Sequence, residues 1–138
     1  MSYLSDIRLM IIDLRIGRVI DQMHKLTVNN KNEIINNIIN DSIYKIRNIN
    51  NNLHSICEQY KKNTENNELS REGELNIVKI IYTLLTLIGD ESHEVSLKLS
   101  DTINTSNIID NKQIKGLIQI LERLHIRTRY SKIIELLR

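Results

Sequence analysis

Residues 75–88 read LNIVKIIYTLLTLI, and this stretch gives the strongest indication of the fold. Its apolar residues recur with helical spacing but cover nearly the whole circumference, and Lys79 is its only formal charge. A helix that is apolar all round is normally enclosed by other helices, whereas a surface helix keeps one polar side. We therefore expect a central core helix, begun by Ser70 as N-cap and ended by Gly89 as C-cap.

The segments on either side of this stretch have the spacing of amphipathic helices, and the chain contains no proline to interrupt them. The predicted helices cover residues 5–25, 33–40, 42–60, 70–88, 91–105, 110–125 and 130–138, and polar connectors are expected at 27–31 and 61–68. The sequence thus predicts an all-α fold. It is expected to be a compact bundle of six to seven helices around one central apolar helix, in a single domain over residues 1–138.

The first predicted helix carries two adjacent apolar stripes. One contains Leu4, Ile7, Ile11 and Leu14, and the other contains Ile12, Ile16, Val19, Met23 and Leu26. Two stripes indicate either burial over a wide arc or one side for the core and another for a partner. On the second interpretation, the candidate interaction face is Ile12, Ile16, Val19 and Met23. Gly17 is compatible both with close approach of another helix and with codon bias.

The composition restricts the class of partner and the cellular setting. The net charge is only +2 and the aromatic residues, 4 % of the chain, are all tyrosine, which argues against a nucleic-acid partner. The single cysteine, Cys57, fits a reducing compartment. Charges at Asp6 and Arg8 argue against a signal peptide, and no uncharged stretch is long enough to span a membrane. We therefore expect a cytoplasmic protein.

Codon bias explains the unusual residue usage. The chain contains 26 Ile and 17 Asn but no Ala, Pro, Phe or Trp. Ile and Asn have A/T-rich codons, so an A/T-biased genome is indicated, as in certain large DNA viruses, phages, some bacteria and protists.

The sequence contains no motif that carries chemistry by itself. Phosphate-binding glycine loops, H-E-x-x-H, C-x-x-C and G-x-S-x-G are all missing, and the four histidines lack the spacing of metal ligands. Cys57 lies on an apolar helix face, where a structural thiol is expected. Basic residues near the end of the chain are typical of helix C-termini, with a surface for nucleic acid or an acidic partner as the alternative; they are Arg123, Arg127, Arg129, Lys132 and Arg138. We predict a non-enzymatic protein with no catalytic residue, metal or cofactor.

One alternative is an enzyme. Arg47, Asn48 and His54 form an R-N-x5-H pattern, which resembles the signature of HEPN-type ribonucleases, a family of all-helical domains. The resemblance implies that Arg47 and His54 meet across a dimer and act on the ribose 2′-oxygen and the phosphate. The tyrosine that usually follows the histidine in that family is missing here.

The order of segments resembles the short Bcl-2-like proteins of poxviruses over most of the chain. The matching features are an amphipathic first helix, the stretch DSIYKIR at 41–47, a short helix at 53–60, an apolar helix ending in glycine at 77–89, and IDNK at 109–112 before a C-terminal amphipathic helix. The aromatic residues common in that family's first helix are missing, and so is the cellular family's Asn-Trp-Gly-Arg signature.

This resemblance implies a virus-encoded protein in the host cytoplasm. Its partner would be a host signalling protein of the NF-κB or interferon pathways, or a regulator of apoptosis, and the first helix would serve a possible homodimer. A third interpretation is a helical structural or assembly protein of a virus or phage, which predicts an oligomer with large apolar contacts.

Overall fold

The computed structural model describes residues 3–106, 108 and 111–129. These residues form five α-helices and no strand: α1 (Leu4–Leu14), α2 (Ile16–Asn29), α3 (Glu33–Glu65), α4 (Arg71–Ser106) and α5 (Lys112–Arg129). The predicted all-α class is therefore confirmed. The last predicted helix, 130–138, lies outside the described residues.

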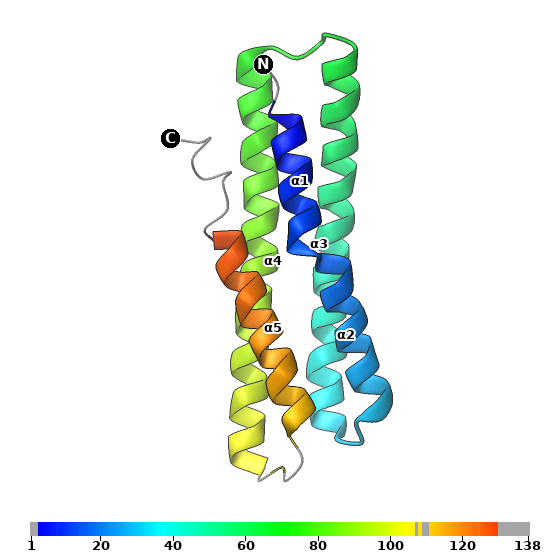
Figure 1. The fold of residues 1–138 in the computed structure, drawn as a ribbon, viewed down its shortest axis with the longest axis vertical. Coiled ribbons are helices and arrows are strands. Elements are labelled where there is room, and N and C mark those ends of the chain that lie inside the picture. Colours follow the sequence, from blue (N-terminus) through cyan, green and yellow to red (C-terminus); the bar gives the residue numbers. More distant parts are fainter. Residues whose placement is uncertain (1–2, 107, 109–110, 130–138) are drawn as a thin grey trace.

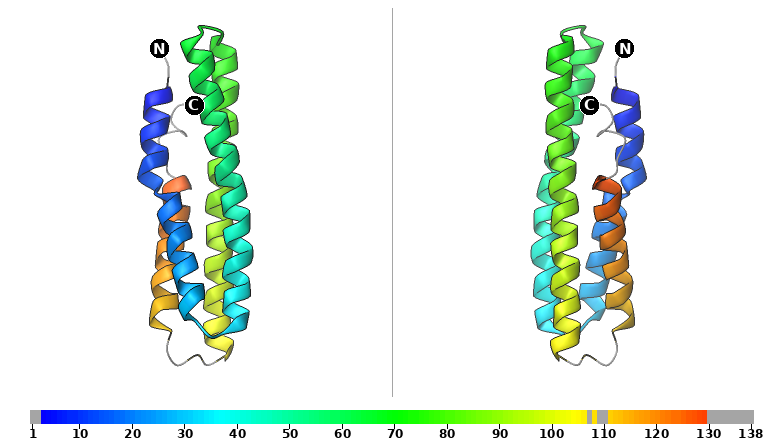
Figure 2. Two further views of the ribbon diagram at one scale, coloured as in Figure 1. Left: turned by 90° about the vertical axis from the view of Figure 1, so that its right-hand side faces the viewer. Right: turned by 90° about the vertical axis from the view of Figure 1, so that its left-hand side faces the viewer.

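The helices run up and down in two layers. Figure 1 shows α3 and α4 as a long antiparallel hairpin, with α1 and α2 following one another along α3 and with α5 beside part of α4. In Figure 2, α3 and α4 form one layer, and α1, α2 and α5 form the other. The largest interfaces join α4 to α5 and α3 to α4. The described part of the molecule is thus elongated rather than compact.

α3 is one continuous helix of 33 residues, so the predicted break between 33–40 and 42–60 is wrong. It begins where the Asn32 side chain accepts a hydrogen bond of 3.1 Å from the backbone N–H of Ile35. Ser42, where a separate helix was expected to begin, is instead buried within α3. The asparagine-rich stretch 48–52 remains helical because packing outweighs its weak intrinsic propensity. The helix also extends through most of the predicted loop at 61–68.

α4 also continues through an expected break. Its N-terminus is as predicted, because the Ser70 hydroxyl accepts a 3.0 Å hydrogen bond from the Gly73 N–H. Gly89, however, is not a C-cap. It is buried within the 36-residue helix, where an added Cβ atom would collide with Oγ1 of Thr128 on α5 and lie 3.1 Å from its Cβ. The glycine therefore permits close approach of α4 and α5, which is a different role from ending the helix.

Residues 75–88 are helical as predicted, but α4 is not enclosed on all sides, so the predicted central position of this stretch is wrong. Ile81, Leu85 and Ile88 are fully buried, but Ile80 and Leu87 are 45 % and 46 % exposed. The physical reason is the two-layer arrangement: α4 packs against α3 on one side and α5 on another, and its outer side faces water. The all-round apolar character of this stretch therefore leaves apolar residues on the surface.

The first predicted helix, 5–25, is in fact two helices. α1 ends at Leu14, and Arg15 adopts a left-handed conformation with φ of 52° before α2 begins. The first stripe turns inward on α1, and the second stripe turns inward on α2 from Ile16 onward, whereas its first member, Ile12, stays exposed on α1. A Cβ atom added at Gly17 would lie more than 4 Å from every atom of another helix, so no helix approaches this glycine closely.

Replacing Gly89 by alanine should destabilise the protein. Alanine gains about 1 kcal/mol of helix propensity, but the added methyl group collides with Thr128, and overpacking of this kind typically costs about 1–3 kcal/mol. Thr128 cannot turn away freely because its hydroxyl donates a 2.8 Å hydrogen bond to the His125 carbonyl. We expect G89A to lower the free energy of unfolding in urea by about 1 kcal/mol.

Gly17→Ala is the matched control, since its new methyl group meets no neighbour. It should raise the free energy of unfolding by up to about 1 kcal/mol. Equal stability of the two variants would contradict the close contact between α4 and α5.

Candidate functional site

The predicted interaction face does not lie on the surface of the described chain. Ile16, Val19 and Met23 are buried in the hydrophobic core, and only Ile12 is exposed, at 67 %. The reason is the break at Arg15, which directs the second stripe into the core instead of toward a partner. Of the predicted face, only Ile12 remains exposed, and it lies with the exposed Leu9 on the outer side of α1.

Arg47 and His54, the pair of the ribonuclease interpretation, are both exposed on α3. Seven residues make almost two helical turns, so they leave α3 on the same side about 10 Å apart along its axis. The Arg47 guanidinium Nη2 lies 2.8 Å from Nε2 of His24 on α2. Within one copy, Arg47 thus contacts another histidine than the one the motif suggests.

The structure brings together a polar cluster that the sequence analysis missed. His93 and Ser96 on α4 meet Glu122 and His125 on α5. The His93 Nδ1–H donates to Glu122 Oε1 at 2.7 Å, and the Ser96 hydroxyl donates to the same oxygen. The His125 Nδ1–H donates to the Gly89 carbonyl at 3.0 Å, and the two imidazole rings stack with centroids 4.6 Å apart.

The signal for this cluster was present in the sequence as two pairs with i,i+3 spacing. His93 and Ser96 share one side of α4, and Glu122 and His125 share one side of α5. Each pair by itself looks like an ordinary solvated surface. Only the antiparallel contact between α4 and α5, made close by Gly89, places them opposite one another.

The hydrogen bonds of this cluster join α4 to α5, so we call its four residues the interhelical clasp. They do not have the arrangement of a nucleophilic site. Ser96 is buried and donates to a carboxylate, whereas an activated serine donates to a histidine that acts as base. Burial by itself would raise the pKa of Glu122, but the hydrogen bonds from Ser96 and His93 and the charge of the imidazoles outweigh it and lower this pKa. Glu122 is therefore held as a carboxylate.

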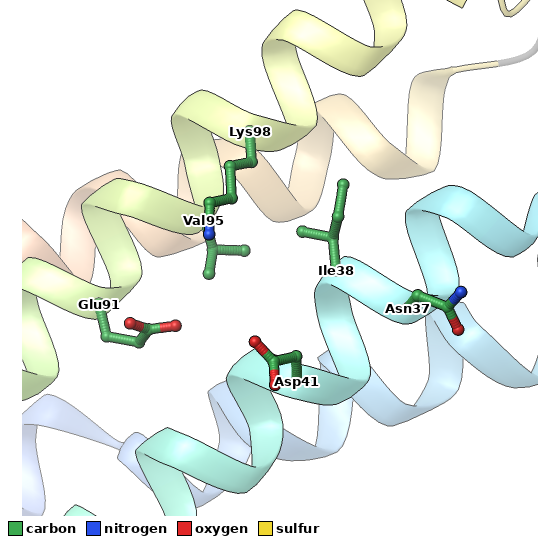
Figure 3. A pocket seen from close by; sticks show the side chains of 6 residues that line it. All are labelled: Asn37, Ile38, Asp41, Glu91, Val95 and Lys98. Carbon is green, nitrogen blue, oxygen red and sulfur yellow. The ribbon is translucent and has the colours of Figure 1, made fainter.

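A cavity of about 430 Å³ opens between α3 and α4. Figure 3 shows its lining, with Asn37, Ile38 and Asp41 from α3 and Glu91, Val95 and Lys98 from α4. The carboxylates of Asp41 and Glu91 point toward one another across it. Asp41 pairs with Lys45 at 3.2 Å and Lys98 pairs with Glu94 at 3.3 Å, but Glu91 forms no salt bridge with a described residue.

Burial raises the pKa of Glu91, and the charge of the nearby Lys45 only partly offsets this effect. Its carboxylate would thus gain from a further cation in the cavity.

The remaining candidates give no site for a cofactor or metal. Burial raises the pKa of the Cys57 thiol, which makes it a weaker nucleophile at neutral pH. Among the described residues, no group of three or more His, Cys, Asp or Glu side chains is arranged to hold a metal ion.

In the described part of the chain, no helix is long and apolar enough to cross a membrane. Arg123, Arg127 and Arg129 are exposed on α5, and Lys132 and Arg138 lie outside the described residues.

Comparisons with protein-family models, with curated proteins and with solved structures found no match to this chain.

The lowered pKa of Glu122 predicts a pH-dependent contribution to stability. A carboxyl group with a lower pKa in the folded state than in the unfolded state stabilises the fold above its unfolded pKa, near 4.5, and loses this contribution as the pH falls through the folded pKa. We expect wild type to be more stable than E122Q at pH 7, and the difference to shrink below pH 4.5. Urea unfolding followed by circular dichroism between pH 7 and 3 measures this.

Glu58→Gln on the exposed side of α3 is the control and should leave the pH profile close to that of wild type. A difference between wild type and E122Q that stays constant over this range would contradict the clasp.

Proposed function

We propose that the chain is a non-enzymatic module that binds another protein. The observation that carries this proposal is the outer face of the α3–α4 hairpin, where Ile80 and Leu87 are exposed beside half-buried apolar residues. Contiguous apolar surface on a folded protein marks an interaction site. The main polar cluster of the described residues is occupied by contacts between α4 and α5, so it offers no open chemical centre.

A narrower form of the proposal is a poxvirus Bcl-2-like modulator of host NF-κB or interferon signalling or of apoptosis, acting in the cytoplasm of the host cell. The order of segments and the A/T-biased composition support it. The exposed side of α4 counts against it, because the resemblance implies an enclosed central helix. The broader proposal does not depend on this identity, since it rests on the exposed hairpin face.

Affinity capture combined with light scattering tests the broader proposal. The tagged chain, immobilised in host-cell lysate, should retain a defined protein in near-stoichiometric amount, and the purified chain should scatter as a monomer or dimer. The double variant I80D/L87D should lose the partner, because each aspartate places a charge on the apolar contact. V28D, at an exposed position on α2, should keep it.

Large oligomers without a captured protein would favour the alternative of a viral or phage assembly protein. Retention of the partner by I80D/L87D would keep the binding function and reject this face.

The second candidate function is a HEPN-type ribonuclease. The projection of Arg47 and His54 from the same side of α3, both exposed, favours it. Under our proposal, the purified chain should leave single-stranded RNA intact at every concentration at which it dimerises. Cleavage that is lost in both R47A and H54A, but retained in the exposed-site variant N51A, would overturn the non-enzymatic proposal. Gel analysis of a labelled RNA gives the measurement.

A further inference from the structure

The outer side of the hairpin contains an apolar line that leads into the cavity. On α4, Ile80, Leu84 and Leu87 precede Glu91 by eleven, seven and four residues, spacings that keep helical residues on one side. On α3, Ile49 and Ile56 follow Ile38, which also lines the cavity, by eleven and eighteen residues, so these three share one side of the helix. Since the two helices are antiparallel and Asp41 and Glu91 share the cavity, these two rows flank one another. We call them the α3/α4 seam, comprising Ile49, Ile56, Ile80, Leu84 and Leu87.

No helix of the described chain covers the seam. α1, α2 and α5 all lie in the opposite layer, as both views of Figure 2 show. Ile80 and Leu87 are each nearly half exposed, and Ile49, Ile56 and Leu84 are only partly buried against the core. A groove between two antiparallel helices fits a third helix, whose side chains pack between the ridges of both.

The cavity at the end of the seam specifies the charge of such a helix. Asp41 and Lys98 form salt bridges with charges on their own helices, whereas Glu91 forms none with a described residue. The charges of Lys45 and Lys98 and a hydrogen bond with Ser42 offset the burial of its carboxylate only in part. A lysine or arginine can extend its aliphatic stem along apolar surface and place its charge in a polar recess. A pair between that charge and a half-buried carboxylate is stronger than a pair in open solvent.

We propose that the α3/α4 seam binds an amphipathic helix of a partner protein, whose apolar side lies on the seam and whose lysine or arginine, one turn beyond, pairs with Glu91. This inference rests on the protein-binding function proposed above and specifies its site and the chemistry of its partner. Recognition by apolar anchors at i, i+3 and i+7 is the common mode for a helix in a groove. The charged residue would fix the direction of the bound helix.

Two designed peptides test the proposal. Both are fluorescein-labelled helix formers with leucines at i, i+3, i+7 and i+10; one has lysine at i+14 and the other has glutamate there. Fluorescence polarisation measures their dissociation constants for the full chain. We expect the lysine peptide to bind about tenfold more tightly than the glutamate peptide, because only lysine pairs with Glu91.

Variants of the chain locate the binding. E91Q should remove the preference between the peptides, and E91K should reverse it. I80D/L87D should weaken both peptides at least about tenfold, whereas V28D, an equally polar change at an exposed position in the other layer, should leave both unchanged. Circular dichroism shows that each variant keeps its helices.

Three results would overturn the proposal: no measurable binding of either peptide, equal binding that E91Q and E91K do not alter, or equal loss in V28D and I80D/L87D. Self-association that I80D/L87D abolishes would also overturn it, because the occupant would then be a second copy. Capture of a lysate partner that is insensitive to the seam and Glu91 variants would reject this inference while leaving the protein-binding function in place. Failure to capture any partner would instead count against that function.

Discussion

The packing of α4 on two sides only is the constraint on which the rest of the structure depends. With 36 residues, α4 extends about 54 Å, and it is apolar over most of its circumference near its middle. α3 covers one side and α5 covers another, but no described helix covers the third. Apolar side chains therefore remain at the surface, and their exposure is a consequence of architecture rather than of a local defect.

The close contact of α4 with α5 determines where polar chemistry can lie. Gly89 lets the two backbones approach, and Thr128 fills the space that a side chain would otherwise occupy. That approach brings His93 and Ser96 within hydrogen-bond reach of Glu122. The Glu122 carboxylate then has its acceptor capacity directed to α4, so the cluster stabilises the interface and is poorly placed to bind a substrate.

The sequence was sufficient for the helical class and for local signals such as the Ser70 cap, because these depend on spacing and on single hydrogen bonds. It was insufficient to predict where helices end or continue. Gly89 has the identity of a C-cap residue, and only the neighbour on α5 shows that it is an interior contact. Arg15 carries no breaking signal at all, yet its left-handed conformation decides that Ile16, Val19 and Met23 enter the core. Such choices are made by tertiary packing, which a periodic pattern does not contain.

Tertiary contacts also give the carboxylates of Glu91 and Glu122 different environments. Glu91 and Glu122 both occupy positions within helices, and their sequence neighbours do not show what each carboxylate faces. Glu122 faces a helix that supplies a serine and a histidine as donors, and its pKa falls. Burial in the cavity raises the pKa of Glu91, because the nearby Lys45 and Lys98 offset it only in part. One carboxylate therefore accepts two hydrogen bonds from the facing helix, whereas the other forms no salt bridge with a described residue and would gain from a further cation. Glu91 lies on the same outer face of the hairpin as the exposed Ile80 and Leu87. The carboxylate and the apolar side chains therefore both favour a partner at this surface.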